Sequence, residues 1–106
     1  MSVPLRGHQR IDQRSLEFLR AIAAKLRMHP ELVEIARENI ARWSANGGRS
    51  QRYWDAWREI LERPLERVLA LIVEDSEKMI ALRQATPFAG VLEPRERWAV
   101  YSRFNS

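Results

Sequence analysis

The fold of this chain is constrained most by its longest apolar run, the six residues at positions 68–73. Such a run is typical of a strand buried in a sheet, or of a helix surrounded by other elements. A strand needs a second strand to pair with, and the sequence contains no other candidate. We therefore expect residues 68–73 to belong to a central buried helix, and the chain to be an all-α, compact bundle of five to six helices.

The other apolar residues recur every three or four positions, the spacing of a helix face that is turned toward a core. Leu19, Ile22 and Leu26 form one such stripe. Asp12 lies before it and is suited to capping a helix N-terminus. Similar stripes follow and predict a single helical domain over residues 12–106. The expected helices cover residues 13–28, 30–45, 51–62, 64–85 and 94–104.

Proline and glycine mark the expected helix ends. Pro30 suits the first turn of a new helix, and the Asn-Gly-Gly sequence at 46–48 suits the left-handed end of that helix. Pro64 begins the fourth helix and Pro87 ends it. A break in the fourth helix at residues 74–76 is an alternative, because a capping residue there can start a new helix.

Residues 1–11 have no apolar period, so we expect them to form a flexible basic arm. The chain has 18 Lys and Arg residues against 14 Asp and Glu, a net charge of +4, and nearly all of the basic residues are arginine. Arginine suits carboxylates, phosphates and aromatic faces, which favours an acidic partner. No segment is long and apolar enough to span a membrane, so we expect a cytoplasmic protein without a membrane partner.

The connection between the fourth and last helices, residues 83–98, is apolar where loops are usually polar. Its apolar side chains either close the chain's own core or contact a partner. The last helix is too short to be stable alone, so its aromatic stripe must dock on this chain or on another. The tryptophans of the third helix likewise either belong to the core or contact a partner. The candidate partner-binding residues are Trp54, Trp57, Arg83, Phe88, Val91, Leu92, Arg97, Trp98, Tyr101 and Phe104.

The sequence lacks the residue patterns of common catalytic, metal and cofactor sites. It has no cysteine, and its two histidines, His8 and His29, are too far apart to indicate a helical metal pair or a catalytic dyad. No nucleophile elbow or phosphate-binding glycine loop occurs. We therefore expect no catalytic, cofactor or metal residues, and a protein that is not an enzyme.

Nucleic-acid binding is an alternative. Arginine beside an aromatic residue, as at Arg97 and Trp98, also occurs in single-strand binders, although their aromatics usually lie on sheets. Residues 21–43 resemble a helix-turn-helix, which with the basic arm would make a small DNA-binding regulator. Glu31 and Glu34 near the start of its second helix would repel phosphate. We therefore expect operator binding to be weak.

Self-association is a further alternative. Leu65, Leu69 and Ile72, with Met79 one heptad later, are spaced like the seam of a coiled coil. The sequence therefore also allows a homo-oligomer that pairs along this seam.

Several segments of the chain resemble one family of small bacterial proteins. The segments are residues 30–32 (PEL), 36–43 (ARENIARW), Trp54 with Trp57, 82–84 (LRQ), 87–92 (PFAGVL) and 96–98 (ERW). In this order they resemble the antitoxin partners of mycobacterial-type nucleotidyltransferase toxins in type II toxin–antitoxin systems. The resemblance covers about residues 28–101 and is most specific at 87–92. It implies a helical, non-catalytic antitoxin that binds and neutralises a toxin protein which adds nucleotides to transfer RNA.

Overall fold

The computed structural model describes residues 7–45 and 47–105, with side chains at residues 12–45 and 47–103. In this part of the chain every regular element is helical and no strand forms, so the expected all-α bundle is confirmed. The elements in order are α1 Gly7–Met28, the 3-10 helix η1 Pro30–Leu32, α2 Val33–Ser44, α3 Gln51–Leu61, α4 Leu65–Leu71, α5 Glu77–Leu82 and α6 Pro94–Asn105.

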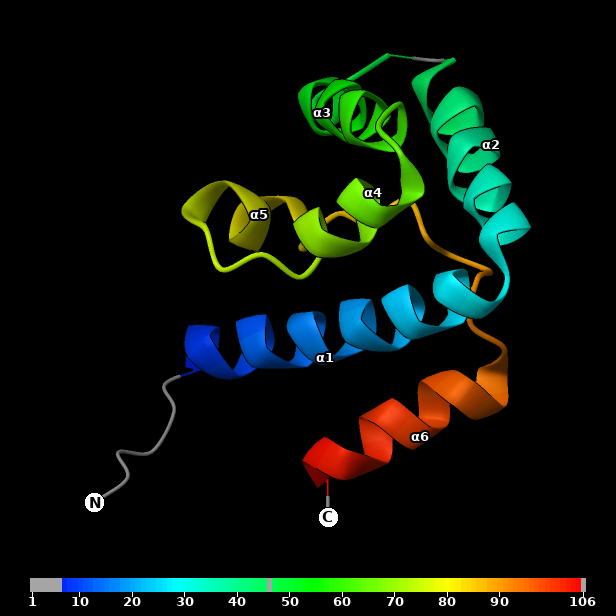
Figure 1. Cartoon of the computed structure of the whole chain (residues 1–106). Helices are drawn as coiled ribbons and strands as arrows, with labels where there is room; N and C mark the ends of the chain where they lie inside the picture. The colour runs from blue at the N-terminus through cyan, green and yellow to red at the C-terminus, as the bar shows by residue number, and fades with distance from the viewer. Residues whose placement is uncertain (1–6, 46, 106) are drawn as a thin grey trace.

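Helix α1 lies between two groups of helices (Figure 1). On one side α4 packs against α1, and on the other side α6 runs along it. Helix α2 follows α1 through η1 and pairs with α3. Helix α6 is therefore a layer of its own, separated from the rest of the bundle by α1.

The core is formed by the stripes that the sequence shows. Its largest fully buried side chain is Trp57 of α3. Leu19 and Leu26 of α1, Ile40 of α2 and Ile72 after α4 are also fully buried. Helical spacing alone identified these residues, because each helix turns a single apolar face toward the centre.

Helix α1 begins earlier than expected. The sequence predicts a flexible arm over residues 1–11, and the structure describes a helical backbone for residues 7–11 of that segment. These positions contain no proline, and glycine only at the first, so nothing stops the helix from extending. Asp12 therefore lies inside α1, where its carboxylate accepts a hydrogen bond from Gln84 Nε2 at 3.1 Å. Residues 1–6 lie outside the described part of the chain.

The single helix expected over residues 64–85 is wrong. This segment is divided into α4 and α5 around residues 74–76, where the sequence also allows a break. Ser76 caps α5, because its Oγ accepts a hydrogen bond from the backbone N–H of Met79 at 3.2 Å. The heptad seam therefore does not lie along one helix.

The apolar run at 68–73 is buried on one side only. Val68, Leu69 and Ile72 face the core, whereas Ala70 is exposed. The expectation of a helix buried on all sides is thus corrected. A helix of only seven residues in a small bundle has too few neighbours to be covered on every side.

The corner that follows α5 packs inward. Phe88, Val91 and Leu92 are buried within the same core cluster as the helix stripes. The ring of Phe88 meets Trp57 edge-on, with the ring centroids 5.5 Å apart. The corner therefore closes the chain's own core.

A buried amide holds this corner in place. Asn39 of α2 is only 4% exposed, and its Nδ2 donates to the carbonyl oxygens of Pro87 and Ala89, each at 2.9 Å. Gly90 turns the chain with a φ of +94°, which residues with a side chain rarely adopt. The position at which α6 starts is therefore set by α2.

Candidate partner-binding surface

Helix α6 runs antiparallel to α1 and is attached to it near both ends (Figure 1). Near the start of α6, Glu96 forms an ion pair with Lys25 of α1. Near its other end, the ring of Tyr101 meets the ring of Phe18 edge-on at 6.5 Å between centroids. Val100 is buried on the same side of α6. One face of α6 is thus used for docking, and the opposite face is open.

The carboxylate of Glu96 is used within the chain. Its Oε1 also accepts a hydrogen bond from the backbone N–H of Glu93 at 2.8 Å, which helps to cap α6. The hydrogen bond from Lys25, and then the one from Glu93, lower the pKa of Glu96 below its ordinary value. Glu96 is therefore charged at neutral pH, and its charge stabilises the contact between α1 and α6.

Trp98 on the open face of α6 and Tyr101 at the border of this face with α1 are both exposed aromatic side chains. Trp98 is 69% exposed and Tyr101 is 39% exposed. Their ring planes are parallel, at 1° to each other, with centroids 6.3 Å apart. Together with Phe18, Pro94 and Arg97 they line an open groove of about 420 Å³, the α6 groove.

Two arginines give the α6 groove a positive charge. The guanidinium of Arg14 lies over the ring of Tyr101, with Cζ 5.1 Å from the centroid and Nη1 3.5 Å from the phenol oxygen. The side chain of Arg97 is exposed and makes no hydrogen bond or ion pair with the residues that the structure describes. A free guanidinium beside aromatic rings is suited to a carboxylate of another molecule.

The ten candidate residues from the sequence fall into separate places. Arg97, Trp98 and Tyr101 lie together at the α6 groove. Phe104 belongs to α6, but its side chain lies outside the described part. Five candidates are buried in the free chain, so contact with a partner stays a prediction for them: Trp57, Arg83, Phe88, Val91 and Leu92.

Trp57 is a core residue with its polar atom paired. It is 0% exposed, and its Nε1 donates to the carbonyl oxygens of Leu82 at 3.2 Å and Ala85 at 2.8 Å. Because the indole N–H has internal acceptors, the side chain needs no partner molecule to satisfy it. Trp57 thus fastens the end of α5 to α3.

Arg83 is used to hold the break between α4 and α5. It is 5% exposed, and its Nη1 donates to the carbonyl oxygens of Ile72 at 3.2 Å and Glu74 at 3.0 Å. These carbonyls have no helical partner, because α4 ends before them. Burial lowers the pKa of Arg83, and the charges of Asp12 and Asp75 partly oppose this shift. The guanidinium is therefore a structural clamp.

Trp54 lies away from the α6 groove. It is half-buried on α3, and its ring is 5.0 Å from the ring of Trp43 on α2. The α2–α3 pair is on the other side of α1 from α6 (Figure 1). The structure therefore does not bring Trp54 together with the groove residues.

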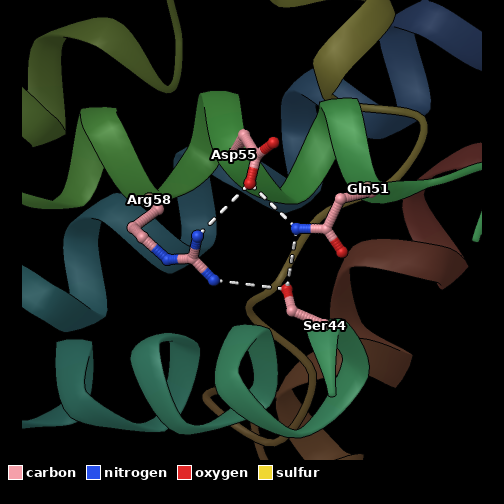
Figure 2. A network of polar contacts seen from close by, with 4 residues as sticks. All are labelled: Ser44, Gln51, Asp55 and Arg58. Carbon is pink, nitrogen blue, oxygen red and sulfur yellow. Dashed lines mark hydrogen bonds and ion pairs between the residues drawn. The ribbon is translucent and has the colours of Figure 1, made fainter. Parts of the chain in front are cut away.

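A ring of polar side chains joins α2 to α3 (Figure 2). Gln51 and Arg58 both donate to Ser44 Oγ, at 3.4 and 3.3 Å, and both donate to Asp55 Oδ1, at 2.8 and 3.2 Å. The hydroxyl of Ser44 faces two donors, so no base in the ring is placed to take its proton. The ring joins the two helices, and no sequence motif predicts it.

Sequence reasoning missed the α1 side of the groove. Arg14, Phe18, Ala21 and Lys25 are spaced by four, three and four, so they share a second face of α1 beside the buried stripe. An aromatic residue on that face is the signal that could have revealed a second docking surface. The buried stripe of α1 gives no sign of this second surface.

The comparisons with known proteins give no match: no family model, curated protein or solved structure matches the chain. Among the described residues, no helix has both the length and the apolar character needed to cross a membrane. No group of three or more His, Asp or Glu side chains that could hold a metal ion occurs in this part of the chain.

Proposed function

We propose that this chain is a non-catalytic antitoxin that binds a nucleotidyltransferase-type toxin through the α6 groove and neutralises it. The observation that carries the proposal is the pair of exposed rings, Trp98 and Tyr101, beside the free guanidinium of Arg97. Aromatic residues and arginine supply most of the binding energy at protein interfaces. The motif resemblance, which includes residues 30–32, 36–43, 82–84, 87–92 and 96–98, suggests the kind of partner.

The geometry favours protein binding over DNA reading by residues 21–43. The arginines of α2 are engaged within the chain: Arg37 donates to the carbonyl oxygen of Leu61 at 2.7 Å and pairs with Glu34, and Arg42 donates to Asn39. A recognition helix needs such side chains free for phosphates and bases. DNA regulation therefore has no supporting contact on this helix.

The test is co-expression with the product of the neighbouring gene, which the proposal requires to be a nucleotidyltransferase-like toxin. We expect growth to be restored and the two proteins to co-purify. Trp98→Ala should abolish both effects, because truncating an aromatic anchor typically costs ~2 kcal/mol or more in binding free energy. Met28→Ala is the matched control, because Met28 is 75% exposed and does not line the groove.

Thermal unfolding of each free variant separates lost binding from lost folding. Trp98 is mostly exposed, so Trp98→Ala should keep the melting temperature of the parent chain. The proposal is wrong if the parent chain fails to relieve toxicity, or if folded Trp98→Ala relieves it as well as the parent does.

A further inference from the structure

The α6 groove has a defined size and a mostly apolar lining. Its volume of about 420 Å³ is at the lower end of the ~300–1,000 Å³ that is typical of small-ligand clefts. The walls are the rings of Phe18, Trp98 and Tyr101 with Pro94, and the groove is open along one side. It therefore has room for one or two large side chains of a partner, and not for a whole helix or domain.

The charge around the groove that is not neutralised within the chain is mostly positive. Glu96 is paired with Lys25, and Glu17 of α1 is paired with Arg20 at 2.5 Å. Glu93, directly before α6, is exposed and has no ion pair with a described residue. Arg95 and Arg97 lie on α6 itself, and Arg14 faces it.

The free guanidinium of Arg97 defines what the apolar occupant must carry beside it. Its planar fork matches a carboxylate with two parallel hydrogen bonds, which are about twice as strong as neutral ones. Arg97 lines the same groove as the rings, so the carboxylate and the apolar group must be close together on the partner.

Single-stranded nucleic acid fits this groove less well. A base that stacks between two rings needs about 7 Å, twice the ~3.4 Å stacking distance, and the parallel rings of Trp98 and Tyr101 are 6.3 Å apart between centroids. Single-strand sites also follow ~4–16 nucleotides along a basic track. A groove lined by five residues offers no such track.

We infer that the α6 groove binds a protein segment in which an aromatic or large aliphatic side chain lies within one helical turn of an Asp or Glu. The apolar side chain lies in the open groove against Phe18, Pro94 and Trp98, and the carboxylate pairs with Arg97. The inference rests on the proposed function in one respect only, namely that this segment belongs to the toxin.

The experiment is a selection from a phage-displayed library of random 12-residue peptides on the immobilised full chain. Elution and counter-selection against Trp98→Ala retain the peptides that need the groove. We expect a consensus with an aromatic or large aliphatic residue next to Asp or Glu. The best peptide, synthesised and titrated by fluorescence polarisation, should bind Arg97→Glu at least about tenfold more weakly than the parent.

Arg95→Glu is the matched control, because Arg95 is exposed on the same helix and does not line the groove. It should change the affinity for the peptide by less than about threefold. A second selection on Arg97→Glu should exchange the acidic residue of the consensus for Lys or Arg. Such an exchange would show that residue 97 reads the charge of the partner.

Three results would overturn the inference. The first is a consensus without a carboxylate, or no peptide that depends on Trp98. The second is equal weakening by Arg95→Glu and Arg97→Glu, which would mean a diffuse charge effect. The third is tight binding of a 15-nucleotide oligo-dT or oligo-U that is lost in Trp98→Ala, which would assign the groove to nucleic acid.

These outcomes can be separated from the test of the proposed function. An acidic-aromatic consensus together with failure to neutralise the toxin leaves the groove assignment intact and removes the antitoxin function. Neutralisation that depends on Trp98 but not on Arg97 supports the antitoxin function and removes the pairing of Arg97 with a carboxylate. The two statements therefore stand or fall on different measurements.

Discussion

The buried amide of Asn39 gives the sharpest test of how α6 is positioned. Asn39→Ala removes the two hydrogen bonds, each 2.9 Å long, that its Nδ2 donates to the carbonyl oxygens of Pro87 and Ala89. Pro87 is buried, so its carbonyl oxygen is left without a donor, which costs ~1–3 kcal/mol. Ala89 is exposed and its carbonyl can turn to water, so the second loss is ~0.5–1.5 kcal/mol.

We therefore expect Asn39→Ala to lower the free energy of unfolding by about 2–4 kcal/mol, a large share of the stability of a small domain. Equilibrium unfolding in urea, followed by far-ultraviolet circular dichroism, measures it. Glu38→Ala is the matched control, because Glu38 is the exposed neighbour on α2, and it should change stability by less than ~0.5 kcal/mol. A loss of under about 1 kcal/mol for Asn39→Ala would show that the corner does not depend on this amide.

The next three predictions use the same unfolding curves, and the last uses amide exchange. Trp57→Phe keeps a buried ring but removes the donor to two carbonyl oxygens, so it should cost ~1–3 kcal/mol, and a neutral result would contradict the pairing. Gly90→Ala should cost ~1–2 kcal/mol through its φ of +94°, since the added Cβ meets no atom closer than 3.6 Å. Ser76→Ala removes the cap of α5 and should cost ~1 kcal/mol. The pKa of Glu96 is lowered in the folded chain, so its contribution is present above its ordinary value of 4.5 and is lost as the pH falls through the lower folded value. The protection factors of the α6 amides, which compare each exchange rate with the intrinsic rate at the same pH, should therefore fall in acid, and Lys25→Gln should weaken this pH dependence; equal acid sensitivity in that variant would refute it.

The fold was largely predictable because helix signals in this chain are local. Leu19, Ile40 and Trp57 lie on the stripes that helical spacing identifies, and all three are buried. Pro94 likewise marks the first residue of α6. Such signals depend on neighbours within a few residues, so one sequence carries them in full.

What the sequence could not decide depends on contacts between distant residues. The fourth helix is broken at a place where Arg83 can reach the free carbonyl of Ile72, eleven positions earlier. The corner at 87–92 is core because Asn39, some fifty positions away in the chain, supplies its donors. Side-chain periodicity contains no information about such pairs.

The candidate site was predicted only on its α6 side for the same reason. Arg97, Trp98 and Tyr101 were identified because an aromatic stripe on a short terminal helix stands out. Phe18 and Arg14 complete the groove from α1, about eighty residues earlier in the chain. Only the antiparallel docking of the two helices brings the sets together.

The one-sided attachment of α6 has a consequence for how such a chain can change over generations. Val100 and Glu96 hold α6 on α1, whereas residues 95, 97 and 98 point outward and contribute little to folding. Substitutions at these outward positions leave the stability of the fold almost untouched. If the α6 groove binds a partner as proposed, its preference for that partner can therefore drift faster than the fold that presents it.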